Sequence, residues 1–248
     1  MPDPEPKIVL LAGATGLVGQ LALETLLESP ETGRVFAITR RPLGREHPRL
    51  ANRIVQFENI ETQLKGLTCQ VAVCCLGTTI RQAGSEAEFR RVDVDHVLAF
   101  ARTAKAAQAQ RFVVVSSAAA NPESKNFYLR TKGEMEAALA NVGFTSLDIL
   151  QPGLLLGLRN QMRPLELAAM LVMPLVNPFL RGQREALRAI SAKTVAAAIV
   201  GAIRSGRRGV QRYTYDGIEA LSRLKSVRTI PLPDPKATRD AARRRNME

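Results

Sequence analysis

Three glycines at three-residue intervals follow directly on a short apolar run, and this pattern limits the fold more than any other part of the chain. The apolar run covers residues 8–12, the glycines are Gly13, Gly16 and Gly19, and an amphipathic stretch continues to Leu27. This order predicts a buried strand, a tight turn and a helix whose first turn carries few side chains. Backbone N–H groups and the positive end of the helix dipole can then approach a pyrophosphate. The spacing differs from the general G-x-G-x-x-G dinucleotide pattern, so a purely structural turn is the alternative.

Strand-like and helical segments alternate over the first 150 residues, and this alternation predicts an α/β fold. The strand-like segments are short, rich in Val and Ile, and lack polar–apolar alternation, as in a parallel sheet that is covered on both faces. Helices between such strands imply right-handed crossovers and therefore a doubly wound, Rossmann-like sheet. The predicted strands are residues 7–12, 34–39, 53–57, 71–76, 111–116 and 146–150, and the predicted helices are 17–28, 61–67, 86–109 and 128–141.

The pattern changes after Pro152, which suggests a division of the chain into three parts. We expect an NADP-binding domain at residues 1–157, a small C-terminal subdomain on the substrate side at 158–221, and a basic, poorly ordered tail at 222–248. Beyond Pro152 the sequence predicts an apolar, loop-broken stretch, a helix and a late strand, at residues 154–180, 192–204 and 212–215.

Charge and composition indicate which kinds of ligand or macromolecule the protein can bind. A net charge of +12 over 248 residues favours anionic partners such as nucleotides. Aromatic residues make up 4% of the chain and Trp is absent, so base-stacking platforms, and nucleic-acid binding with them, are not expected. Cys69, Cys74 and Cys75 have no C-x-x-C spacing and no neighbouring histidine, which argues against a metal site or a disulfide framework. Because no secretory signal peptide and no membrane-spanning apolar run are found, we expect a cytoplasmic protein.

Arg40 and Arg41 follow the second predicted strand, where the fold would place the adenosine ribose of a dinucleotide. A site that prefers NAD usually has an acidic residue near this point, whereas a 2′-phosphate is bound by arginine. No carboxylate competes with the two arginines. We therefore expect NADPH/NADP as the cofactor in preference to NADH, with a solvated surface pair of arginines as the alternative.

Gly77 and Thr78 follow the fourth predicted strand. A glycine at the carboxyl end of a strand lets a ligand approach the backbone closely, and a threonine hydroxyl can bond ribose or phosphate. Ligands of open α/β sheets lie outside the carboxyl ends of the strands. These residues are therefore candidate cofactor contacts, and an ordinary polar turn is the alternative.

Ser116 and Ser117 end the fifth predicted strand, and Tyr128 and Lys132 stand four residues apart on the next helix, so that both face the same way. A lysine ammonium near a phenol favours the phenolate and lowers its pKa. The tyrosine can then act as general acid or base while hydride moves to or from a carbonyl or alcohol. Lys132 can also bond the nicotinamide ribose, and a serine hydroxyl can hold the reacting oxygen. Many amphipathic helices carry Tyr-x-x-x-Lys by chance, but this one lies downstream of the serines in a dinucleotide fold.

Together these residues resemble the extended and atypical branch of the short-chain dehydrogenase/reductase superfamily, and most closely the Tat-interacting-protein type of NADPH-binding oxidoreductase and its bacterial relatives. The matching segments are residues 13–19, 40–41, 74–79, 83–84, 92–93, 116–117, 128–134 and 151–153. The resemblance implies a Rossmann-like fold, NADPH binding and a Ser/Tyr/Lys catalytic set. By position it implies pyrophosphate contacts at Gly13, Thr15, Gly16, Leu17 and Gly19, 2′-phosphate contacts at Arg40 and Arg41, ribose-side contacts at Gly77 and Thr78, and contacts to the nicotinamide end at Pro152 and Gly153. It makes Tyr128 and Lys132 the catalytic pair, and Ser116 and Lys132 are also candidate cofactor contacts.

Two residues depart from the family pattern. Gln151 stands where the family usually has arginine, and Ala118 stands where extended members often have the catalytic serine. Ser117 is therefore the candidate to hold the substrate oxygen, with Ser116 as the alternative. The expected function is an NADPH-dependent oxidoreductase that uses Ser117, Tyr128 and Lys132. The alternatives are an NADPH-responsive binding or regulatory protein with a protein partner, and an NAD-dependent epimerase/dehydratase-like enzyme.

Overall fold

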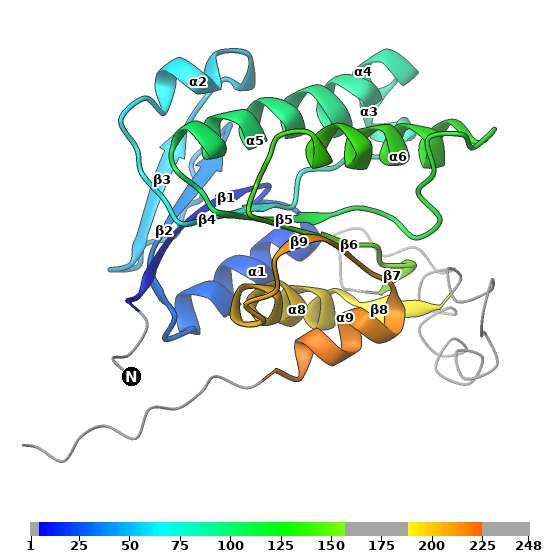
Figure 1. Ribbon diagram of the computed structural model, residues 1–248. Helices are drawn as coiled ribbons and strands as arrows, with labels where there is room; N and C mark the ends of the chain where they lie inside the picture. Colours follow the sequence, from blue (N-terminus) through cyan, green and yellow to red (C-terminus); the bar gives the residue numbers. More distant parts are fainter. Residues whose placement is uncertain (1–4, 157–187, 225–248) are drawn as a thin grey trace, which may run out of the picture.

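A seven-stranded sheet lies at the centre of the structure, a computed structural model that describes residues 5–156 and 188–224 (Figure 1). Its strand order is β3-β2-β1-β4-β5-β6-β9, and every neighbouring pair is parallel. The predicted Rossmann-like, doubly wound sheet is therefore confirmed. The strands are β1 (Lys7–Ala12), β2 (Thr32–Thr39), β3 (Leu50–Ile54), β4 (Val71–Cys74), β5 (Arg111–Val115), β6 (Ser146–Leu150) and β9 (Gly209–Tyr213).

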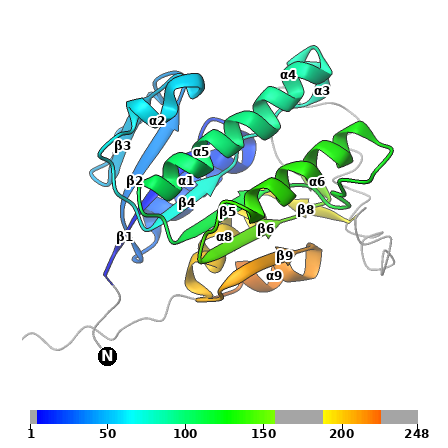
Figure 2. The ribbon, with the colours of Figure 1, turned by 45° about the horizontal axis from the view of Figure 1, so that its top comes forward.

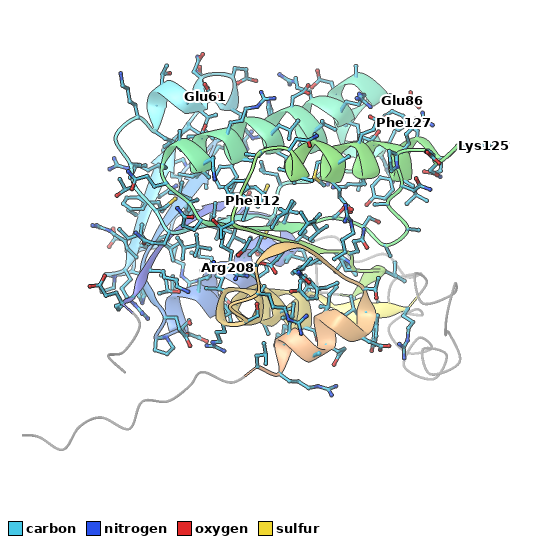
Figure 3. The ribbon with its side chains drawn as sticks, in the orientation of Figure 1. Glu61, Glu86, Phe112, Lys125, Phe127 and Arg208 are labelled. Atoms are coloured by element: carbon cyan, nitrogen blue, oxygen red, sulfur yellow. The ribbon has the colours of Figure 1, made fainter. Side chains whose placement is uncertain are left out.

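Helices cover both faces of the sheet, as the continuous apolar strands require (Figures 1 and 2). One layer contains α1 (Leu17–Glu28), α8 (Ala192–Arg204) and α9 (Tyr215–Ser222), and the other contains α2 (Ile60–Gln63), α5 (His96–Ala106) and α6 (Phe127–Ala140). Successive residues of a strand point to opposite faces, so Val9 belongs to the first core and Leu10 to the second. In the second core, Phe112 of β5 packs between Phe100 and Phe144, with ring centroids 5.9 and 4.9 Å away (Figure 3).

The segment predicted as one helix at 86–109 is interrupted. It consists of α4 (Glu86–Arg90), a π turn that we call η2 (Arg91–Asp95), and α5, and it is preceded by the short helix α3 (Ile80–Ala83). Sequence periodicity predicted a continuous helix because a single π turn adds one residue without interrupting the apolar pattern. The helix predicted at 61–67 is shorter and begins earlier: it is α2, and the 3₁₀ turn η1 (Phe57–Asn59) precedes it directly.

The third strand lies three residues earlier than predicted. β3 forms the edge of the sheet beside β2, and its residues are half-buried or exposed. An edge strand needs no continuous apolar run, so the apolar signal at 53–57 was misleading.

The part of the chain after residue 188 adds to the same sheet. The predicted helix at 192–204 is confirmed as α8, and the late strand begins earlier than predicted, at Gly209, and pairs with β6 as β9. A second, two-stranded sheet of β7 (Leu154–Leu156) and β8 (Ala189–Ser191) was not predicted. The three-part division of the chain stays a prediction, since most of the expected apolar stretch and the tail from 225 lie outside the described residues.

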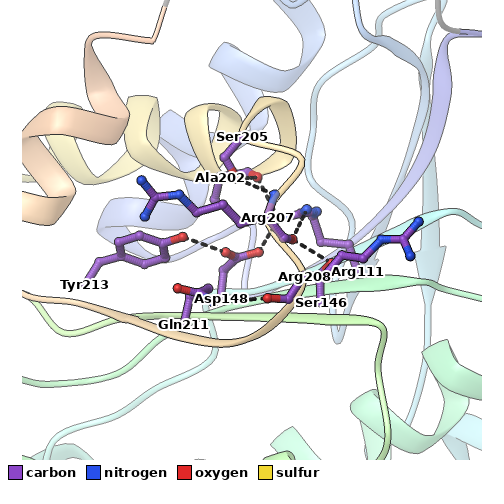
Figure 4. Close-up of polar contacts among 9 residues, drawn as sticks. All are labelled: Arg111, Ser146, Asp148, Ala202, Ser205, Arg207, Arg208, Gln211 and Tyr213. Atoms are coloured by element: carbon purple, nitrogen blue, oxygen red, sulfur yellow. Dashed lines mark hydrogen bonds and ion pairs between the residues drawn. The ribbon is translucent and has the colours of Figure 1, made fainter.

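A buried ion pair fastens α8 to the amino-terminal half of β5 and β6 (Figure 4). Arg111 and Asp148 are joined by an Nη1–Oδ2 distance of 2.5 Å, and Asp148 is wholly buried. Arg111 also donates to the carbonyl oxygens of Ala202 and Arg207, each at 2.7 Å, and the Tyr213 hydroxyl donates to Asp148 at 3.0 Å. The guanidinium and the carboxylate are thus hydrogen-bonded within the protein, as a buried pair requires.

Candidate functional site

The glycine turn joins β1 to α1 at the carboxyl edge of the sheet, and two of its glycines have no room for a side chain. Gly13 has a left-handed φ of +83°, and a Cβ there would clash with the carbonyl group of Cys75, which follows β4. A Cβ at Gly19 would clash with the carbonyl oxygen of Gly13. Gly16 precedes α1 without any side-chain cap, and its N–H donates to Gly13 at 3.0 Å. The first turn of α1 therefore presents uncapped N–H groups and the positive end of the helix dipole.

A cavity of about 660 Å³ opens beside this turn, where the strand order reverses between β1 and β4. Open α/β sheets bind ligands at such switch points, and the volume is that of a small-molecule site. Seven predicted cofactor contacts line it: Gly13, Thr15, Gly16, Leu17, Arg40, Gly77 and Thr78. Gly19 and Arg41 do not line the cavity. The cavity therefore brings together, beside the start of α1, residues that the sequence predicts to contact a pyrophosphate.

The wall of the cavity near Arg40 contains residues that sequence reasoning missed. The His96 ring stacks on Phe57 with centroids 5.1 Å apart, and its Nε2 lies 3.5 Å from a carboxylate oxygen of Glu58. Within the described residues, Nε2 makes no hydrogen bond. Burial lowers the pKa of His96, the Glu58 carboxylate opposes this, and the nearby positive charge of Arg91 adds to it. His96 was missed because it lay inside the segment predicted as one continuous helix.

A buried ion pair lies directly behind Gly77. Lys132 Nζ is 2.6 Å from Asp93 Oδ1, and the two side chains are 5% and 0% exposed. The other Asp93 oxygen accepts a hydrogen bond from the backbone N–H of Thr78 at 2.9 Å. Burial by itself lowers the pKa of Lys132, but the Asp93 carboxylate and the Tyr128 phenol outweigh it, so the pKa of Lys132 is raised above its ordinary value. Lys132 is therefore held as an ammonium ion close to the cavity.

The sequence contains a signal for the buried position of Asp93 that the prediction of a single helix did not take into account. It occupies the buried face of its segment together with Phe89, Val97 and Phe100, so a carboxylate stands in an otherwise apolar stripe. A buried acid needs a partner, and the partner is a predicted catalytic residue. The sequence had marked Asp93 only as part of the family resemblance.

Tyr128 lies in the first turn of α6, on the same face as Lys132. Its half-buried ring is 5.7 Å from that of Phe89, and Asn126 caps the helix by accepting the N–H of Leu129 at 3.1 Å. Lys125 and Phe127 mark this end of α6 in Figure 3. The cap fixes where the helix begins and hence the direction of Tyr128.

The two candidate serines have different surroundings. The Ser116 hydroxyl donates to Glu136 of α6 at 2.6 Å, and Glu136 is 3% exposed. The same carboxylate accepts both hydrogen bonds of the Gln151 amide, at 2.9 and 3.0 Å, and pairs with Arg212 of β9 at 3.2 Å. Glu136 and Arg212 were not predicted, and a polar residue four positions beyond Lys132 was the available signal.

Ser117 is half-buried, and its hydroxyl lies 3.3 Å from the carbonyl oxygen of Ala118. The N–H of Ala118 donates to Pro152 at 2.9 Å, which places Pro152 beside the serines and Gly153 next to it in the chain. Ser116, Ser117, Pro152 and Gly153 thus lie together just beyond the carboxyl ends of β5 and β6. Neither these residues nor Tyr128 and Lys132 of α6 line the cavity.

Residues 5–156 and 188–224 hold no cluster of His, Cys, Asp or Glu that could bind a metal ion, and no helix there is long and apolar enough to cross a membrane. The cysteines are free, and burial raises the pKa of Cys74 to about 12, so its thiol stays protonated.

A family model described as NAD(P)H-binding matches residues 13–205, which include the glycine turn, Arg40, Asp93 and Lys132. The chain belongs to this NAD(P)H-binding family. Protein HTATIP2 from Rattus norvegicus is 37% identical over 162 residues, or 64% of this chain and 66% of the relative. This relative confirms the predicted resemblance. The chain spans just under two thirds of the length of HTATIP2. The fmp52 protein from Aspergillus fumigatus is 35% identical over 64% of this chain and 71% of the relative.

Solved structures confirm the fold of this NAD(P)H-binding protein. The enzyme WbmH of Bordetella bronchiseptica in complex with NAD⁺ has a TM-score of 0.63 at 18% identity, covering 87% of this chain and 79% of WbmH. The human epimerase family protein SDR39U1 with NADPH has a TM-score of 0.56 at 18% identity, covering 84% and 74%. At such identities the likeness concerns the fold alone.

The expectation of a cytoplasmic protein is wrong. Relatives from Aspergillus fumigatus and from two yeasts, 34–35% identical, are named mitochondrial. The sequence argument tested only for a secretory leader and for membrane spans, and neither test separates the cytoplasm from an organelle.

Proposed function

We propose that the protein is an NADPH-dependent oxidoreductase that moves hydride between the cofactor and a carbonyl or alcohol. One observation carries this proposal: the glycine turn, Arg40 and Gly77 line a single cavity, and the buried Lys132 ammonium lies behind Gly77. This arrangement supports the proposal, because it would allow cofactor binding and proton transfer at the same edge of the sheet.

Each part of NADPH has candidate binding residues in or near the cavity. The uncapped first turn of α1, with Gly13, Thr15, Gly16 and Leu17, would hold the pyrophosphate. Arg40 lines the cavity and would bind the 2′-phosphate, with Arg41 adding positive charge from outside the lining. Thr78 and Lys132 would bind the ribose next to the nicotinamide, and Pro152 and Gly153 would contact the ring. When bound, the nicotinamide supplies or accepts the hydride.

The chain's own residues would handle the proton. Tyr128 would donate its phenolic proton to the substrate oxygen during reduction and take it back during oxidation, while the Lys132 ammonium stabilises the phenolate. Ser117 would hold the same oxygen, because its hydroxyl makes only a weak contact with the Ala118 carbonyl. Ser116 is the poorer candidate, since its hydroxyl is committed to the buried carboxylate of Glu136.

Calorimetric titration with NADPH and NADH tests the cofactor assignment. Arg40→Ala should weaken NADPH binding by about ten- to a hundredfold, because a charge-assisted hydrogen bond to phosphate is lost. NADH binding should stay within about twofold, since NADH has no 2′-phosphate. Arg41→Ala is the matched control, with a smaller expected effect because Arg41 does not line the cavity. Equal affinity of the wild type for both cofactors would reject the NADPH assignment.

An NADPH-responsive binding protein is the second candidate, and the environment of the serines favours it. Ser116 is bound to Glu136, and Ala118 follows where a third hydroxyl would help to hold a substrate. A panel of carbonyl substrates with wild type and Tyr128→Phe separates the two. Turnover that the phenylalanine abolishes supports the enzyme, whereas NADPH binding without Tyr128-dependent turnover supports the binding protein. The fungal relatives make mitochondria the compartment to test first.

A further inference from the structure

Asp93 is a wholly buried carboxylate in a rare backbone conformation. It lies in the π turn η2, between α4 and α5, and its side chain has no exposed surface. Single π turns are uncommon and are found frequently at functional sites. This turn packs against α6, the helix that carries Tyr128 and Lys132.

The two oxygens of Asp93 contact two different elements, of which only the loop with Thr78 lines the cavity. Oδ1 lies 2.6 Å from Lys132 Nζ, and Oδ2 accepts the N–H of Thr78 at 2.9 Å. One carboxylate therefore connects η2 both to α6 and to the loop after β4. Both of its partners are residues that the proposed function assigns to the cofactor.

We propose that Asp93 is a positioning residue, whose carboxylate holds the Lys132 ammonium and the backbone of Thr78 in the arrangement that receives the ribose next to the nicotinamide. This inference rests on the proposed NADPH-dependent function. Asp93 itself would not contact the substrate and would act through its two partners.

The charge of Lys132 depends on this contact. A buried ammonium without a counter-ion tends to lose its proton, because burial disfavours the charged form. The groups that favour the charged form are Asp93 from η2, Tyr128 from α6 and Cys74 from β4, and Asp93 has the largest effect of the three. An ammonium has three N–H donors, so Lys132 can face the Asp93 carboxylate and still donate to a ligand.

Gly77 leaves these donors within reach of the cavity. A Cβ added to Gly77 would lie 3.8 Å from Lys132 Nζ and 3.6 Å from Asp93 Oδ1, which is ordinary contact distance. The glycine thus covers the ion pair with backbone alone. A ribose that lies against Gly77 would come close to the ammonium without crossing a side chain.

The variant Asp93→Asn distinguishes a role of the carboxylate charge in positioning Lys132 from a role of the side chain in packing alone. The amide keeps the shape of the side chain and can still accept the Thr78 N–H, but it cannot compensate the charge of Lys132. Asp95→Asn is the matched control, because Asp95 lies two residues further in the same turn and is exposed. Both variants are to be made in the full chain.

The first measurement follows Lys132 without any cofactor. With lysine labelled by ¹³C at Cε, the Lys132 NMR signal is identified by its loss in Lys132→Met and titrated against pH. Asp93→Asn should lower the titration midpoint by at least about one pH unit, while Asp95→Asn should leave it unchanged. A wild-type midpoint at or below about 10.4, that of free lysine, would overturn the proposal even if Asp93→Asn did not fold.

The second measurement is NADPH binding by calorimetry between pH 6.5 and 9. Asp93→Asn should bind NADPH about tenfold more weakly, and the loss should grow as pH rises because neutral Lys132 binds the ribose less well. Asp95→Asn should match the wild type. If the Lys132 titration moves but NADPH binding in Asp93→Asn equals that of the control, Asp93 is structural and the positioning role is rejected. If the wild type binds no NADPH, the proposed function fails instead, and the titration still judges the link between Asp93 and Lys132.

Discussion

Two buried ion pairs lie toward opposite ends of the sheet's strands, one toward the amino ends and one beyond the carboxyl ends, and they differ in the groups that surround them. Arg111 and Asp148, near the amino ends of β5 and β6, are enclosed by protein groups: two backbone carbonyls accept from the arginine and a tyrosine donates to the aspartate (Figure 4). Asp93 and Lys132, beyond the carboxyl end of β4, lie behind a glycine of the cavity wall. The same chemistry fastens a helix in one place and faces a ligand site in the other. The partners of a buried pair, more than its burial, indicate its role.

The largest expected effect comes from breaking the enclosed pair. Asp148→Ala leaves the buried Arg111 guanidinium without its counter-ion and should cost about 3–5 kcal/mol of unfolding free energy. Affinity for NADPH, measured where the variant is still folded, should stay within about twofold, because the pair lies far from the cavity. Denaturant unfolding and calorimetry check the two parts. Glu61→Ala removes an exposed carboxylate of α2 and is the control. A large loss of NADPH affinity in folded Asp148→Ala would remove the distinction between the pairs.

A third buried carboxylate, Glu136, is an intermediate case, because it is buried like Asp148 and Asp93 but its cationic partner is partly exposed. Its cationic partner Arg212 is half-exposed, so Arg212→Ala should destabilise the protein by only about 1 kcal/mol. Gln151→Arg would restore a cation beside Glu136, since Gln151 already contacts both carboxylate oxygens. The double variant should recover the lost unfolding free energy. If Gln151→Arg changes the unfolding free energy by the same amount with and without Arg212→Ala, the introduced arginine and Arg212 do not act through Glu136.

The smallest effect concerns His96 and pH. Because burial lowers the pKa of His96 in the folded protein, the unfolded chain binds its proton more readily. Stability should therefore fall as pH drops below about 6.5, the ordinary pKa of histidine, with a slope of no more than about 1.4 kcal/mol per pH unit from this group. Unfolding measured from pH 5 to 8 should show a weaker pH dependence in His96→Gln. If His96→Gln keeps the pH dependence of the wild type, His96 is not its source.

Sequence reasoning predicted the parts of the fold that local pattern determines. Apolar strands without alternation implied a sheet covered on both faces, and the three glycines implied a strand, a tight turn and a helix, which are β1, the turn and α1. It failed where a residue's role depends on a distant partner. Asp93 is explained by Lys132, 39 positions later, and Glu136 by Arg212, 76 positions later, so neither pairing was visible in a local window. Ser116, the alternative to Ser117, donates its hydroxyl to Glu136, which lies 20 positions later and likewise outside a local window.

The edge strand β9 also decides how far the chain can be shortened. All five residues of β6 are buried, and β9 pairs along its whole length. A chain cut at residue 157, at the expected end of the nucleotide-binding domain, would leave β6 as a bare apolar edge with unpaired N–H and C=O groups. Such edges recruit strands from other molecules. A shortened form intended for crystallisation or labelling should therefore retain residues up to at least Tyr213, so that β6 keeps its partner strand.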